Sequence, residues 1–230
     1  ADGLMQLKRR TQARELALSV LEKDPKNPIA AIVMADLALI ARSRETAAEY
    51  LIAALDRSKP HRRVLLFLAY VRSHQGDNLK AAELYGLASK HFPHNVNAVR
   101  GLAVAYLREE NYKAARPVLI MLAHMDADSA SVRRRLAELA LDRNDYAEAI
   151  KYGQAALYVD VMDARTHRML GDAHTGLKEH AKALREFEVA LQITPRDTQI
   201  ELKLVKSLRA NGKTDEAKTR LQQLVEKNPE

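Results

Sequence analysis

An alanine recurs every 34 residues along the chain, and this spacing constrains the fold more than any other feature of the sequence. Seven alanines share the phase, namely Ala13, Ala47, Ala81, Ala115, Ala149, Ala183 and Ala217. A fixed period of about 20–50 residues indicates that a small unit is repeated, each copy burying its apolar face only against its neighbours. We therefore expect an array of stacked units rather than a domain built around one central core.

The pattern is most complete in residues 164–197, which serve as the reference unit. Small, apolar and proline residues fall at places 7, 8, 20, 24, 27 and 32 of this unit, as Leu170, Gly171, Ala183, Phe187, Ala190 and Pro195. These residues at these places resemble the tetratricopeptide repeat (TPR). The resemblance covers nearly the whole chain and implies an all-α fold, a right-handed superhelical solenoid of antiparallel helix pairs.

We interpret residues 1–230 as a single TPR array. A partial repeat over 1–27 begins at the eighth place of a unit, so that its first helix is expected to be cut short. The following repeats cover residues 28–61, 62–95, 96–129, 130–163, 164–197 and 198–230. Natural arrays usually open and close with polar-faced capping units, which this sequence lacks. The chain is therefore expected to be a fragment of a longer protein.

Composition narrows the function classes further. The chain has no cysteine, which excludes disulfides, thiolate metal sites and a cysteine nucleophile. Its net charge of +7 favours acidic partners where the charge is concentrated on one face. No apolar run approaches the roughly 20 residues that a membrane span needs. We expect a soluble protein, with the bacterial cytoplasm and the periplasm both open as compartments.

The first two complete repeats supply an apolar set of candidate contact residues. By analogy with the family, places 2, 5, 6, 9, 12 and 13 of each front helix line the concave surface, because they share one helical face. The apolar candidates at these places are Ile32, Leu66, Phe67 and Tyr70. Asp36 and Arg63 also occupy such places, but they are not assigned to the candidate site.

In the later repeats the same places become basic. The candidates there are Arg100, Arg134, Arg135, Arg165, Arg168, Lys203 and Lys206. Arginine presents a planar fork that suits carboxylates, so these residues predict a groove for a protein segment that is both acidic and apolar. The alternative is that they are solvated or paired with Glu138, Asp142 and Asp172. No repeat has an asparagine at place 9, where the family's chaperone-tail clamp requires one, so a chaperone adaptor is not expected.

No catalytic or metal site can be assembled from the sequence. Phosphate-binding glycine loops, nucleophile elbows and zinc-binding helix motifs are all absent, and no cofactor is predicted. His167 and His174 lie seven residues apart, which is too far for both to ligate one metal ion. They also occupy core places of their unit, so we interpret them as packing residues. Nucleic-acid binding is disfavoured, because the basic places lack interleaved aromatic residues for base stacking.

The predicted function is therefore a non-catalytic scaffold that binds a partner protein or peptide in its concave groove. Two alternatives stay open from the sequence. The unit could self-assemble through its uncapped ends or convex face. It could also be the targeting arm of a larger enzyme or of a bacterial export or secretion machine, which is an analogy at the level of the fold.

Overall fold

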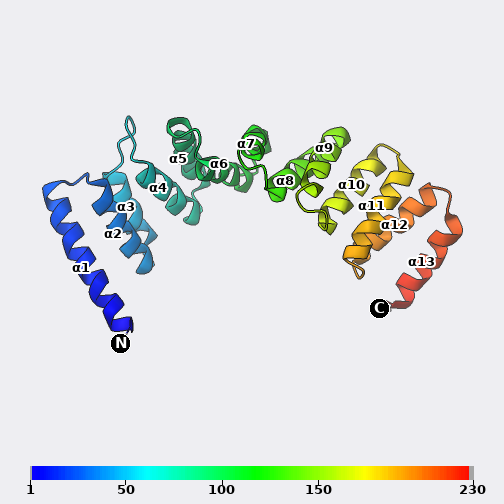
Figure 1. Cartoon of the computed structure of the whole chain (residues 1–230), viewed down its shortest axis with the longest axis horizontal. Helices are drawn as coiled ribbons and strands as arrows, with labels where there is room; N and C mark the ends of the chain where they lie inside the picture. The colour runs from blue at the N-terminus through cyan, green and yellow to red at the C-terminus, as the bar shows by residue number, and fades with distance from the viewer. Residues whose placement is uncertain (1, 228–230) are drawn as a thin grey trace. The chain divides into compact units, whose positions relative to one another are not determined.

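A computed structural model describes the backbone of residues 2–227 and the side chains of residues 9–226 (Figure 1). The described residues form thirteen helices and no strand. In chain order the helices are α1 (Asp2–Lys23), α2 (Pro28–Ile40), α3 (Arg44–Ala53), α4 (Arg62–His74), α5 (Asn78–His91), α6 (Val96–Arg108), α7 (Tyr112–Met125), α8 (Ala130–Leu141), α9 (Tyr146–Leu157), α10 (Ala164–Gly176), α11 (His180–Ile193), α12 (Thr198–Ala210) and α13 (Thr214–Lys227).

The helices are divided between two compact units. The N-terminal unit, Ala1–Met125, contains α1 to α7, and the C-terminal unit, Asp126–Glu230, contains α8 to α13. Within each unit, helices that follow one another in the chain pack side by side as antiparallel neighbours (Figure 1). This arrangement confirms the predicted all-α solenoid of helix pairs.

The helix boundaries keep the phase that the alanines indicated. The front helix of every complete repeat begins at the first place of its unit, at Pro28, Arg62, Val96, Ala130, Ala164 and Thr198. Asparagine or aspartate precedes most of these helices and caps them. Asn95, for example, accepts a hydrogen bond from the Ala98 amide at 3.0 Å. The 34-residue spacing is therefore the spacing of helix pairs.

One left-handed residue in each repeat makes the turn between its two helices. These residues again lie 34 apart, at Arg42, Gly76, Glu110, Asn144, Lys178 and Gly212, with φ between 54° and 84°. The amide of the next residue closes the turn by bonding the carbonyl five residues back, as Asp77 does to Arg72 at 3.0 Å. Only glycine adopts this conformation without a cost of about 1–2 kcal/mol. Helix packing therefore imposes the turn where the sequence offers no glycine.

The first helix differs from the prediction. We expected a shortened front helix followed by a back helix within residues 1–27, and this expectation is wrong, because α1 is one continuous helix of 22 residues. The stretch between Lys8 and Ala17 contains no glycine or proline that could end a helix and start another. Helix propagation adds one backbone hydrogen bond for each further residue, so the helix continues through the expected turn.

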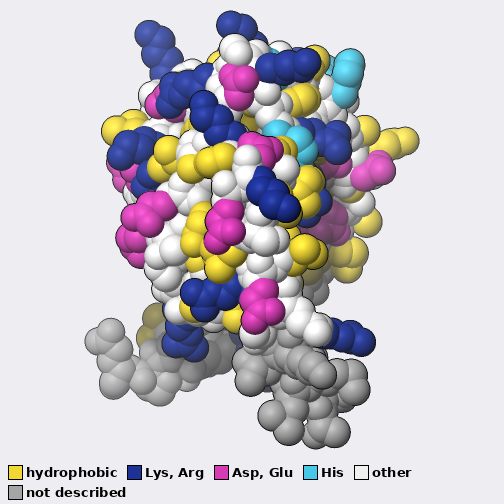
Figure 2. Space-filling model, turned by 90° about the vertical axis from the view of Figure 1, so that its left-hand side faces the viewer, with side chains coloured by type: hydrophobic (Ala, Val, Ile, Leu, Met, Phe, Trp, Pro, Cys, Tyr) yellow, Lys and Arg dark blue, Asp and Glu magenta, His cyan; other side chains and the backbone are white. Residues whose placement is uncertain are grey.

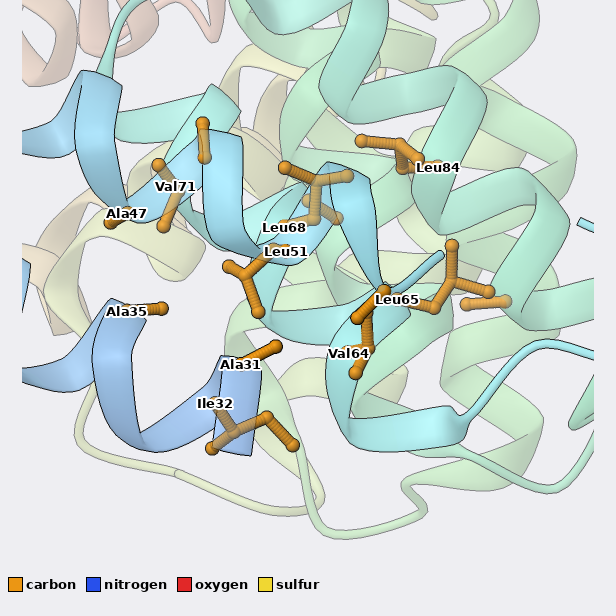
Figure 3. Close-up of a cluster of buried hydrophobic side chains, with 14 of the residues drawn as sticks. Ala31, Ile32, Ala35, Ala47, Leu51, Val64, Leu65, Leu68, Val71 and Leu84 are labelled. Atoms are coloured by element: carbon orange, nitrogen blue, oxygen red, sulfur yellow. The ribbon is translucent and has the colours of Figure 1, made fainter. Parts of the chain in front are cut away.

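The core of the N-terminal unit is built from alanines that face leucines and valines. In Figure 3, Ala31, Ala35 and Ala47 lie beside Leu51 and Leu65 in one cluster that joins α2, α3 and α4. All five side chains are at most 1% exposed. Small residues at the crossing points let neighbouring helices approach closely, and this explains why alanine recurs at a fixed place of the repeat.

The core of the C-terminal unit is centred on a phenylalanine. Phe187 on α11 is 1% exposed and packs in a cluster with Ile200 and Leu204 of α12. Its ring also lies directly on the backbone of Gly171 in α10, where an added Cβ atom would stand 2.5 Å from the ring. The Leu-Gly pair of the reference unit is therefore a packing requirement of the helix crossing.

Candidate functional site

Three of the four apolar candidates of the N-terminal unit come from two neighbouring front helices and line one pocket. Ile32 of α2 and Leu66 and Phe67 of α4 line a pocket of about 290 Å³. Asp36 and Arg63 complete its lining. Ile32 is only 4% exposed and belongs mainly to the core, so only a small part of its side chain lines the pocket.

Tyr70 extends the aromatic surface of α4 beyond the pocket. Its side chain is 46% exposed, and its ring centroid lies 6.4 Å from that of Phe67 and 4.0 Å from that of His74. Arg108 of α6 contacts the C-terminal end of α4, where it donates a hydrogen bond to the Ser73 hydroxyl at 2.7 Å. Arg100 is an exposed residue of α6 in the same unit. Leu66, Phe67 and Tyr70 therefore form a partly exposed apolar surface on α4.

Asp36 and Arg63 carry the charge of the pocket. Asp36 is an exposed residue, but the partial burial of its carboxyl raises the pKa above its ordinary value, and the positive charge of Arg63 opposes this rise. Among the described residues, the Asp36 carboxylate has no hydrogen-bond or ion-pair partner. The sequence places both residues on the groove face, but their unpaired state is visible only in the structure.

The six basic candidates of the C-terminal unit fall into two groups, and three of them already have carboxylate partners. Arg134 lies 2.5 Å from Asp163, Arg135 lies 2.8 Å from Glu138, and Lys203 lies 2.5 Å from Asp172. Arg135 and Lys203 thus have partners that the alternative interpretation named, whereas Arg134 pairs with Asp163, which it did not name.

Asp163 organises the junction between α8 and α10. It accepts hydrogen bonds from the Thr166 hydroxyl at 2.7 Å, from Arg134 and from the Arg165 amide at 3.1 Å. Burial acts to raise the pKa of this carboxyl, but the hydrogen bonds and the charge of Arg134 outweigh burial and lower it. Asp163 therefore stays ionised at neutral pH, and Arg134 acts as its structural partner.

The remaining three basic candidates have no partner within the described part of the chain. Arg165 and Lys206 are exposed and Arg168 is partly exposed. Within the part of the chain that the structure describes, their side chains make no hydrogen bond or ion pair. Arg165 and Arg168 lie one turn apart on α10, and Lys206 belongs to the next front helix, α12.

His167 and His174 are packing residues, as predicted. Each is 7% exposed, and each bonds a carboxylate through Nδ1, His167 to Glu186 at 2.8 Å and His174 to Glu179 at 2.6 Å. The Nε2 atom of His167 also faces the Val161 carbonyl at 3.0 Å. Both ring nitrogens of His167 thus lie within hydrogen-bond distance of an oxygen atom. Among the described residues, no group of three or more His, Asp or Glu side chains could hold a metal ion.

An exposed apolar loop joins α9 and α10 in the C-terminal unit. Tyr158 is 93% exposed, and Val161 and Met162 are each 66% exposed. The backbone of this loop is held by His167 and by Asp160, which accepts a hydrogen bond from the Met162 amide at 3.3 Å. The loop is thus an ordered connection whose large apolar side chains point to solvent, a feature that no repeat pattern predicted.

Charges of both signs are dispersed over the surface that Figure 2 shows. Lys and Arg side chains alternate there with Asp and Glu side chains and with hydrophobic groups. A net charge of +7 therefore does not by itself define a binding face. The unpaired basic residues on individual helices are more informative than the total charge.

Antiparallel helix pairs that repeat every 34 residues define a helical-repeat protein. The chain belongs to the tetratricopeptide repeat family. One family model described as tetratricopeptide repeat matches residues 72–133 and 175–230, and a second with the same description matches residues 32–88 and 135–198. The predicted family is thereby confirmed. No curated protein sequence matches the chain.

Several solved structures are similar in fold. A crystal structure of MamA protein is 22% identical, covers 72% of this chain and 91% of its own, and gives a TM-score of 0.67. MamA from Desulfovibrio magneticus RS-1 is 15% identical, with coverages of 72% and 93% and a TM-score of 0.63. YrrB, described as a TPR protein with an unusual peptide-binding site, is 19% identical, with coverages of 86% and 99% and a TM-score of 0.68. At these identities the likeness shows the fold.

A helix that crosses a bilayer needs both length and apolar character. None of the described helices combines the two.

Proposed function

We propose that this chain is a non-catalytic scaffold that binds a partner protein through a segment carrying acidic and apolar side chains. The observation that carries the proposal is the unpaired state of Arg165, Arg168 and Lys206 on two consecutive front helices. A cationic group without an internal partner is ready to pair with a carboxylate of another molecule. Arginine in particular offers a fork that binds carboxylates through two hydrogen bonds.

The apolar candidates complete the proposed binding chemistry. Leu66, Phe67 and Tyr70 present partly exposed apolar and aromatic groups on α4, which are typical anchors of binding energy. The printed description of YrrB as a protein with a peptide-binding site supports a peptide as the partner here, as an analogy between folds. A continuous array that spans all six repeats is part of the same proposal.

Reversing the charge of Arg165 and Arg168 to Glu is expected to raise the Kd for an acidic peptide by on the order of tenfold. The probe is a fluorescein-labelled peptide that alternates Glu and Leu, and binding is measured by fluorescence anisotropy at low and at physiological salt. The loss should shrink as salt rises, because exposed charge pairs are screened.

The matched control carries the same charge change on back helices of the same unit. Arg185→Glu with Lys218→Glu alters two exposed residues, on α11 and α13, that have no ion pair among the described residues. This variant should keep most of the affinity. An equal loss in both variants would mean that only the net charge matters, and the basic part of the proposal would then fail.

Self-association is a second candidate function, and the exposed loop between α9 and α10 favours it. Exposed apolar side chains that lie together often mark a protein contact. If copies associate through the loop, Tyr158→Ser with Met162→Ser should shift the chain toward monomer in light scattering across concentration. Leu79→Ser is the control, because Leu79 is 71% exposed on α5 and belongs to the N-terminal unit. A wild-type chain that is monomeric at every concentration would rule this candidate out.

A role as the targeting arm of a larger enzyme or export machine stays a prediction. It rests on an analogy at the level of the fold.

A further inference from the structure

An acidic residue stands at the ninth place of three front helices, and the three differ in their surroundings. Glu138 forms an ion pair with Arg135 at 2.8 Å, and Asp172 forms an ion pair with Lys203 at 2.5 Å. Asp36 has no such partner among the described residues, although it lines the pocket between α2 and α4. Asp36 is an exposed residue beside the apolar side chains of the pocket, so its carboxylate can exchange contacts with water for a hydrogen bond from a bound group.

We propose that the pocket between α2 and α4 binds a Trp or Tyr side chain of the partner segment, with the indole N–H or phenol O–H donating to Asp36. The proposal deepens the scaffold function above and rests on it. It names the anchor residue that the apolar part of the partner would carry, and it assigns to Asp36 and Arg63 a selective role that the sequence did not indicate.

The walls of the pocket favour an aromatic ring. Ile32, Leu66 and Phe67 form its apolar lining, and Tyr70 continues the aromatic surface along α4. Aromatic pairs gain attraction beyond simple burial when their rings stand offset or tilted. A volume of about 290 Å³ suits a single large side chain, since pockets for whole small molecules begin at about 300 Å³.

The carboxylate at the pocket selects for a donor on that ring. A phenylalanine in the pocket would cover part of Asp36 and supply no hydrogen bond, which leaves an acceptor desolvated. Tryptophan and tyrosine combine a large apolar body with one polar donor, so they can fill the pocket and satisfy the carboxylate together.

Arg63 selects against a cationic anchor. Its guanidinium is close enough to lower the pKa of Asp36 by its charge, yet the two groups form no ion pair within the described part of the chain. A lysine or arginine of the partner would approach Asp36 against this positive charge. A neutral donor avoids the repulsion, and this is why we favour an indole or a phenol over an ammonium group.

The absence of tryptophan from the chain makes the test direct. Three peptides of sequence Gly-Ser-Gly-X-Gly-Ser-Gly are titrated into the full chain. X is Trp, Phe or Lys, and the other side chains are uncharged. Binding is followed by methyl NMR signals of Ile32 and Leu66, and for the Trp peptide also by its fluorescence. We expect the Trp peptide to shift these signals and to bind about tenfold more tightly than the Phe peptide, with the Lys peptide weakest.

Two variants separate the roles of the charged groups. Asp36→Ala should bring the Trp and Phe peptides to within about twofold of each other, because the acceptor is gone. Arg63→Ala should improve binding of the Lys peptide while keeping the preference for Trp over Phe. Asp172→Ala is the matched control, since it removes the same group from the same place of another repeat and should leave the Trp preference unchanged. Circular dichroism checks that each variant is folded.

Several outcomes would overturn the inference. Equal binding of the Trp and Phe peptides to the wild-type chain would show that Asp36 selects no donor. Tightest binding by the Lys peptide would define a cation site, and unchanged Ile32 and Leu66 signals with every peptide would show that the pocket is not used. The probes carry no acidic residue, so these results are independent of Arg165 and Arg168. Binding of the Glu-Leu peptide without any binding of the Trp peptide would leave the scaffold function standing and reject this anchor.

Discussion

Phe187→Ala is expected to lower the free energy of unfolding of the C-terminal unit by about 3–5 kcal/mol. Phe187 is 1% exposed, and its ring fills the space between α10, α11 and α12. The substitution removes the apolar contacts of the ring and leaves a cavity. The cavity closes only in part, because the close-packed side chains around it relax incompletely and Gly171 has no side chain to extend into it.

Urea denaturation and hydrogen exchange resolved by segment measure this effect. Amides of α10 to α12 should exchange faster in the variant than in the wild-type chain. Tyr158→Ala is the matched control, because it truncates an aromatic residue of the same unit that is 93% exposed. Its effect should stay within about 0.5 kcal/mol. Similar losses in both variants would contradict the assignment of Phe187 to the core.

Gly171→Ala is expected to destabilise the same unit by about 1–3 kcal/mol, although alanine ordinarily favours a helix. The added Cβ atom would stand 2.5 Å from the buried ring of Phe187, so the ring or the helix must move. The contact involves a ring enclosed on several sides, and it cannot be relieved by rotating a flexible side-chain end.

Gly86→Ala is the matched control for this substitution. Gly86 lies inside α5, and its added Cβ atom would meet only Leu102, at an ordinary contact distance of 4.0 Å. That change should stabilise the chain by about 0.5–1 kcal/mol, as expected for a helix interior. Thermal unfolding followed by circular dichroism compares the two variants, and a stabilising Gly171→Ala would refute the packing argument.

A second substitution tests the contact itself. Phe187→Leu removes the ring that the new methyl group would strike, so Gly171→Ala should cost less in that background than in the wild-type chain. The two residues touch, and their effects are therefore expected to be non-additive by about 0.5–3 kcal/mol. Strict additivity would indicate that the cost of Gly171→Ala arises elsewhere in α10.

Much of the fold could be predicted because its signals are local and repeated. The alanines at place 20 are buried in every complete repeat, and capping residues such as Asn95 and Asp77 precede several of the helices. The buried roles of His167 and His174 followed from the same phase. The expectation of a shortened first helix was wrong, because the sequence has no turn residue there that would interrupt α1.

The candidate site was less predictable, because helical phase places a side chain on a face without saying what it meets there. Arg134 and Asp163 are separated by 29 residues, and their ion pair depends on how α8 packs against α10. Nothing in the spacing distinguishes Arg134 from Arg168, although one is paired and the other is not. For the same reason the sequence did not indicate that Asp36 is unpaired, because Asp36 shares its place in the repeat with the paired residues Glu138 and Asp172.

The sequence by itself determined the repeat, the helix pairs and the face on which each groove residue lies, because a period of 34 residues and the helical period fix these without long-range information. Only the tertiary structure decided which charges are neutralised, where the pocket between α2 and α4 forms and why Gly171 must lack a side chain. Those outcomes depend on distances across helix crossings, where a shift of about 1 Å makes or breaks an ion pair or a packing contact.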